Sequence, residues 1–89
     1  MIKLIAAEVL NDREIRLRFS DGSAGIFDFG IFLAAGTPMT EPLLDPDFFR
    51  RVYIELGALS WPNGFDLSAQ SLHRALDEGG RLTRSSAAA

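Results

Sequence analysis

The chain has 89 residues, 47% of them hydrophobic and 24% charged, which indicates one small globular domain rather than a disordered segment. Its 9 basic and 12 acidic residues give a net charge of −3, so the basic surface typical of nucleic-acid-binding proteins is not expected. The absence of cysteine excludes disulfide bonds, thiol catalysis and zinc thiolate sites.

The first third of the chain predicts a three-stranded antiparallel meander. Residues 2–10 are apolar and β-prone, and a slip in their alternation would be explained by a β-bulge. Residues 13–19 read as a half-buried strand, because Ile15, Leu17 and Phe19 alternate with Glu14, Arg16 and Arg18. The Asp21-Gly22 pair is typical of a hairpin turn, and residues 24–29 follow as the third strand.

The charged face of residues 13–19 carries Arg13, Glu14, Arg16 and Arg18. An antiparallel sheet needs to bury only one side, so this face is either solvated or covered in a dimer or complex. The sequence leaves both alternatives open.

The middle of the chain predicts short helices and a second hairpin. Residues 30–35 are expected to form one or two helical turns, and the segment before Pro42 a loop. Asp45 followed by Pro46 is a typical helix start, because Asp caps backbone N–H groups and proline needs no donor there. Residues 52–61 then read as two strands joined by a turn at Gly57.

Residues 61–67, Trp-Pro-Asn-Gly-Phe-Asp-Leu, contain the only tryptophan. Pro62 lacks a backbone donor, so the strand should end there. Asn63 and Gly64 both tolerate positive φ and predict a turn. Asp66 is expected to accept backbone N–H groups at the start of the next helix.

Residues 68–78 predict the one long helix, with Ser68 as a candidate cap and Gly79 at its end. Its expected apolar stripe comprises Ala69, Leu72, Ala75 and Leu76. We therefore predict a single α+β domain over residues 1–80: a small antiparallel sheet (the meander plus a second hairpin), short helices and one C-terminal helix. Residues 81–89 have no pattern and are expected to be a disordered tail.

No arrangement of residues predicts catalysis, a cofactor or a metal site. Catalysis needs a nucleophile or an acid–base pair, and the single histidine, His73, has no partner placed by the sequence. We therefore expect a protein that is not an enzyme. The competing hypothesis is a small-ligand or enzyme-accessory domain, with Asp28, Asp66 and His73 lining a pocket.

The aromatic turn is the better candidate for binding, because tryptophan and other aromatic side chains anchor many interfaces. The predicted contact surface comprises Trp61, Asn63, Phe65 and Asp66. The alternative is that Trp61 belongs to the core. No segment approaches the roughly 20 apolar residues of a membrane helix, and we expect a cytoplasmic protein.

The order of these features resembles the small bacterial family known as domain of unknown function 2442. The resemblance covers residues 3–76 and rests on the hairpin at residues 20–22, Phe27-Asp28-Phe29, the segment 42–49 and the segment 61–67. It implies a compact α+β domain with no established activity, cofactor or catalytic residue. Genes of such domains often lie beside a companion family, as in toxin–antitoxin pairs, and some relatives carry a following helix-turn-helix module.

We therefore expect a non-catalytic protein-interaction module, the acidic member of a two-gene pair. Its partner would be another protein or a second copy of the chain, without direct binding to nucleic acid or membrane. A regulatory domain related to the helix-turn-helix-linked relatives is the remaining alternative. No second helix pair follows residue 78, so we do not expect operator binding of that type.

Overall fold

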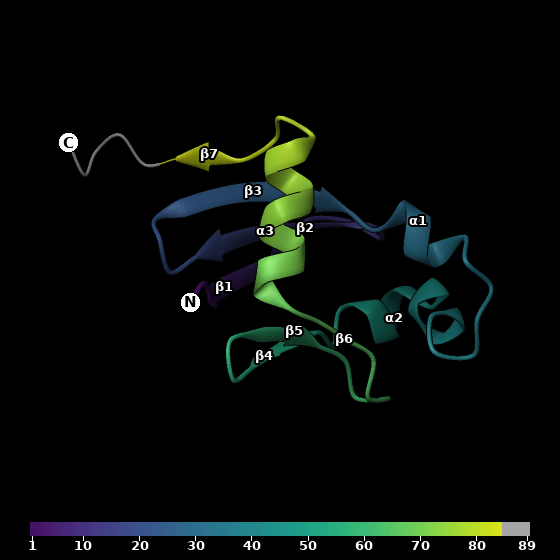
Figure 1. Ribbon diagram of the computed structural model, residues 1–89. Coiled ribbons are helices and arrows are strands. Elements are labelled where there is room, and N and C mark those ends of the chain that lie inside the picture. Colours follow the sequence, from purple (N-terminus) through teal and green to yellow (C-terminus); the bar gives the residue numbers. More distant parts are fainter. Residues whose placement is uncertain (85–89) are drawn as a thin grey trace.

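The structure is a computed structural model that describes residues 1–84. Within this range, two small antiparallel sheets combine with three α-helices and one 3-10 helix (Figure 1). The expected α+β class is confirmed. The helix α3 lies across one face of the first sheet, and the second sheet lies below the first sheet in the view of Figure 1.

The first sheet has the order β1-β2-β3-β7. Its strands are β1 (Leu4–Val9), β2 (Glu14–Phe19), β3 (Ser23–Asp28) and β7 (Thr83–Arg84). The predicted meander and the bulge are both confirmed, the latter by a register shift between Leu4 and Ala6. The strand β7 was not predicted. It pairs with the beginning of β3, so the tail is part of the sheet at these two residues, and residues 85–89 lie outside the described range.

The second sheet comprises β4 (Tyr53–Glu55), β5 (Ala58–Ser60) and β6 (Asp66–Leu67). The predicted hairpin is confirmed as β4–β5, and β6 adds a strand that the sequence did not indicate. Asp66 pairs with Ser60 in this sheet, so the expectation that Asp66 caps the following helix was wrong. The two sheets are joined by a hydrogen bond from the N–H of Leu4 to the carbonyl of Gly57 (2.9 Å).

The helices are α1 (Gly30–Leu33), η1 (Glu41–Leu44), α2 (Pro46–Phe49) and α3 (Ala69–Glu78). The 3-10 helix η1 forms partly within the segment expected to be a loop. The α2 start is as predicted, because the Asp45 side chain accepts the N–H of Asp47 (3.0 Å). Ser68 caps α3 by accepting the N–H of Ser71 (3.1 Å).

The core of the first sheet forms where α3 covers β2 (Figure 1). The inward side chains of β2 are fully buried: Ile15, Leu17 and Phe19. On α3 the buried residues are Ala69, Leu72, His73 and Leu76. This set follows the i, i+3, i+4, i+7 spacing of one helix face, so His73 takes the place that was assigned to Ala75. Ala75 is exposed.

Candidate functional site

Trp61 belongs to the hydrophobic core rather than to the surface. Its side chain is fully buried, and its indole N–H donates a hydrogen bond to the carbonyl of Phe49 (3.0 Å). The ring packs against Phe29 and Phe49, with centroid separations of 5.7 and 6.0 Å. Of the two alternatives left by the sequence, the structure therefore places Trp61 in the core.

The turn that follows Trp61 is fixed by four hydrogen bonds. The N–H of Trp61 binds the carbonyl of Phe65 (2.9 Å), and the N–H of Gly64 binds the carbonyl of Trp61 (3.0 Å). Asn63 accepts the N–H of Phe65 (3.2 Å) and donates its side-chain amide to the carbonyl of Met39 (3.0 Å). Gly64 has φ of +93°, which glycine adopts at little cost. The turn is therefore held rigidly against the loop at residue 39.

An aromatic series leads from this core to the surface. The Phe65 ring lies 5.6 Å from Trp61 and 5.8 Å from Phe32, measured between centroids. Phe32 and Phe65 are half-buried, whereas Met39 has 43% of its surface exposed. We use the name turn surface for the group Phe32, Met39, Asn63, Phe65 and Asp66.

Three of the four predicted contact residues belong to the turn surface. Asn63 and Phe65 are half-buried and Asp66 is exposed, while Trp61 lies beneath them as their support. That these residues contact a partner stays a prediction. Met39 was not among the predicted residues, because only the fold brings its segment beside the turn.

The negative charge of the chain is concentrated in the part that carries the turn. Residues 37–68 contain five carboxylates and two arginines, a net charge of −3: Glu41, Asp45, Asp47, Glu55 and Asp66 against Arg50 and Arg51. All other residues contain seven basic and seven acidic side chains, so they sum to zero. The turn surface therefore lies in the acidic part of an otherwise balanced molecule.

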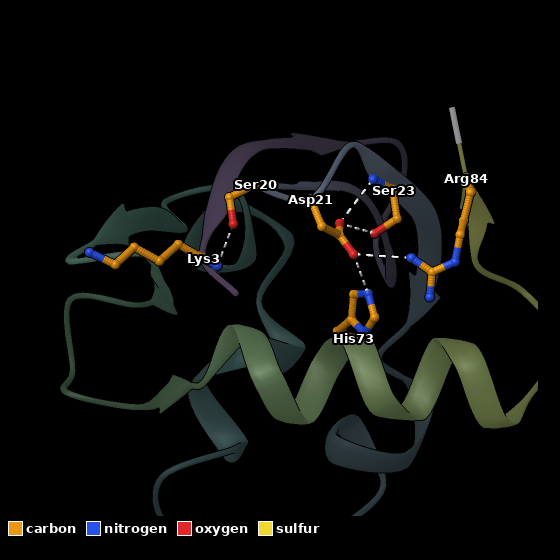
Figure 2. A network of polar contacts seen from close by, with 6 residues as sticks. All are labelled: Lys3, Ser20, Asp21, Ser23, His73 and Arg84. Atoms are coloured by element: carbon orange, nitrogen blue, oxygen red, sulfur yellow. Dashed lines mark hydrogen bonds and ion pairs between the residues drawn. The ribbon is translucent and has the colours of Figure 1, made fainter. Parts of the chain in front are cut away.

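A second group of polar side chains surrounds Asp21 (Figure 2). One carboxylate oxygen accepts the N–H and the hydroxyl of Ser23 (3.0 and 2.5 Å). The other lies 3.0 Å from Nε2 of His73 and 3.1 Å from the Arg84 guanidinium. The hydrogen bonds from Ser23, followed by those from His73 and Arg84, hold the pKa of Asp21 well below its ordinary value, although burial opposes this shift.

His73 acts in this group as a donor. An ionised carboxylate can only accept, so Nε2 of His73 must carry the hydrogen. The imidazole also stands edge-on to the Phe19 ring at a centroid distance of 5.1 Å. Because Ser23 donates to Asp21 and not to His73, the order of contacts differs from a nucleophile–base–acid relay. The group ties the β2–β3 hairpin to α3 and β7.

The pocket expected from Asp28, Asp66 and His73 is not formed. Asp28 faces the side of the first sheet opposite α3, where it pairs with Arg13 (3.1 Å). Asp66 belongs to the second sheet, and His73 is bound to Asp21. Sequence reasoning missed Asp21 as the partner of His73, because the two are 52 positions apart and Asp21 had a sufficient explanation as a turn residue.

The comparisons with known proteins identify a family without a described activity. The model of the family described as Protein of unknown function (DUF2442) matches residues 4–78. Neither a curated protein nor a solved structure shows a match. In the described part of the chain, no helix has the length and apolarity to cross a membrane, and no group of three metal-ligating side chains occurs.

Proposed function

The chain belongs to the DUF2442 family, and we propose that it acts as a non-catalytic protein-interaction module whose contact region is the turn surface. The observation that carries this proposal is the hydrogen-bonded turn at residues 61–66, which holds the half-buried Phe65 beside the segment of the exposed Met39. Trp61 supports the turn from below, and Asn63 locks it to the carbonyl of Met39.

Rigid presentation favours binding because little side-chain and loop freedom is lost when the partner docks. Phenylalanine and methionine are also enriched in the centres of interfaces, where polar side chains form the rim. In the turn surface, Phe65 and Met39 supply the apolar part, and Asn63 and Asp66 supply the polar part. These properties support a preformed contact site for a folded partner or peptide.

The charge distribution supports a basic partner. Met39, Asn63, Phe65 and Asp66 belong to residues 37–68, whose net charge is −3, and complementary charge accelerates association and suppresses wrong partners. We propose that this chain is the acidic member of a two-gene pair, with a small basic protein as its counterpart. A cytoplasmic location fits this role and stays a prediction.

The proposal is tested by affinity capture from the native host with the tagged chain and two variants. Met39→Ser removes an exposed apolar side chain but keeps the carbonyl that Asn63 binds. Leu56→Ser is the matched control, because Leu56 is 94% exposed at the β4–β5 turn. We expect one stoichiometric basic protein with the wild type and with Leu56→Ser, and its loss with Met39→Ser.

Two results would contradict the proposal. One is equal capture of the same protein by both variants, which would place the contact elsewhere. The other is recovery of the bait alone, combined with a monomer in sedimentation analysis, which would also exclude self-association.

A further inference from the structure

The face of the first sheet that points away from α3 is not covered by any helix or strand of residues 1–84 (Figure 1). The register determines which side chains share this outer face. Arg18 of β2 lies between Ala6 of β1 and Ala24 of β3, and Ala24 in turn pairs with Thr83 of β7. Arg18 therefore stands among small side chains.

The neighbouring row of the outer face contains Arg16 of β2. It lies between Glu8 of β1 and Ile26 of β3. Arg81 precedes β7 and borders the same region. An open hollow of about 380 Å³ lies beside these rows, lined by Arg16, Ala24, Gly25, Ile26, Arg81 and Thr83.

The hollow lies on the outer side of β3, and the residues on the two sides of this strand explain why. The opposite side of Gly25 is filled by α3 and the segment after it, since a Cβ there would lie 2.9 Å from both the carbonyl of Arg81 and a methyl group of Leu76. On the outer side, Ala24 and Ile26 give a floor that is apolar, and β7 pairs only with the first two residues of β3. The hollow is therefore open beyond Ala24.

The outer face is positive around this hollow. Arg16 pairs with Glu8 (2.7 Å), whereas Arg18 and Arg81 are exposed and make no ion pair with any residue in the range 1–84. Arg16, Arg18 and Arg81 outnumber Glu8 here. The next row of the same face places Glu14 opposite Asp28, which pairs with Arg13, so the face as a whole sums to +1. This sign is opposite to that of residues 37–68.

We propose that this outer face is a second docking surface, which binds an extended acidic segment of a partner protein. Carboxylates of the segment would pair with Arg18 and Arg81, and its small or apolar side chains would lie on Ala24 and Ile26. Arginine suits this role because its planar group binds carboxylates through paired hydrogen bonds. The surface is separate from the turn surface and does not depend on it.

A peptide fits these observations better than a nucleic acid. Nucleic-acid binding relies on many neutralised phosphates, whereas this face offers three arginines on a chain of net charge −3. The floor at Ala24 and Ile26 also offers no aromatic ring on which a base could stack, as single-stranded nucleic acids require.

The test is a nuclear magnetic resonance titration of the full chain, labelled with nitrogen-15, at low salt. The probe is a short peptide of alternating glutamate and threonine. The same peptide with lysine in place of glutamate and a single-stranded oligothymidylate are the comparison probes. Arg81→Glu is the test variant, and Arg74→Glu, an exposed arginine on α3, is the matched control.

We expect the glutamate peptide alone to shift the amide signals of Arg16, Ala24, Ile26 and Thr83. Arg81→Glu should weaken this binding roughly tenfold, the factor that corresponds to about 1.4 kcal/mol, and Arg74→Glu should leave it unchanged. The proposal is overturned if these signals do not shift, if both variants weaken binding equally, or if the oligothymidylate binds this face as tightly.

Discussion

The indole N–H of Trp61 donates to the carbonyl of Phe49 at 3.0 Å, and this buried bond joins the end of β5 to the end of α2. Phenylalanine at position 61 keeps a large ring but leaves that carbonyl without its partner. An unpaired buried polar group costs about 1–3 kcal/mol, so Trp61→Phe should lower the free energy of unfolding by that amount. Trp61→Ala should cost more, about 3–5 kcal/mol. Urea denaturation of the wild type and both variants measures these free energies of unfolding. A Trp61→Phe variant as stable as the wild type would contradict the role given to the bond.

Asp21 should make stability depend on pH. Its folded-state pKa lies below its unfolded value, so its contribution is complete above the unfolded pKa of about 3.9 and is lost as the pH falls through the folded pKa. Asp21→Asn keeps the shape but removes the charge, and should destabilise the protein by about 1–2 kcal/mol at pH 7. The difference in the free energy of unfolding between Asp21→Asn and the wild type should narrow below pH of about 4.

The matched control for Asp21 is Asp77→Asn, at an exposed residue that makes no ion pair within residues 1–84. The free energy of unfolding of Asp77→Asn should equal that of the wild type at each pH. If the gap for Asp21→Asn stayed constant from pH 7 to the acidic range, ionisation of Asp21 would not be the cause.

Gly25 is expected to be intolerant of any side chain. An added Cβ would meet the backbone carbonyl of Arg81 at 2.9 Å, which cannot move without shifting the segment between α3 and β7. Gly25→Ala should therefore destabilise the protein by about 1–3 kcal/mol. Gly79→Ala is the control, since its closest contact is 3.3 Å and its φ is negative. Thermal unfolding should show a clear loss for Gly25→Ala and a smaller effect for Gly79→Ala.

Leu56 has φ of +51° and is 94% exposed, so its side chain contributes strain and little burial. Asparagine tolerates this conformation, and an Asn-Gly pair favours the tight turn between β4 and β5. Leu56→Asn should stabilise the protein by roughly 0.5–1 kcal/mol. A decrease in the denaturation midpoint would show that the leucine side chain makes a stabilising contact.

Sequence patterns predicted those helices and strands that are determined by residues close together in the chain. The alternation around Ile15 and Leu17 defined β2, and the Asp45-Pro46 pair defined the start of α2 through a cap that the structure contains. The choice between core and surface for Trp61 could not be made, because its partner Phe49 lies 12 positions away.

The remaining differences arise from contacts distant in the sequence. The strand β6 exists because Ser60 pairs with Asp66 across the turn, and β7 exists because Thr83 meets the β2–β3 hairpin region at Ala24. His73 can be buried because the Asp21 carboxylate accepts a hydrogen bond from its imidazole, whereas apolar neighbours would offer no acceptor. The turn surface likewise required the position of Met39, which no pattern near residue 61 reveals.

The central claim is that the turn surface binds a protein partner. The most direct measurement is calorimetric titration of the captured basic protein into the wild type, Met39→Ser and Leu56→Ser. We predict equal affinity for the wild type and Leu56→Ser, and at least roughly tenfold weaker binding by Met39→Ser with an unchanged melting temperature. Equal affinity of all three proteins would contradict the claim.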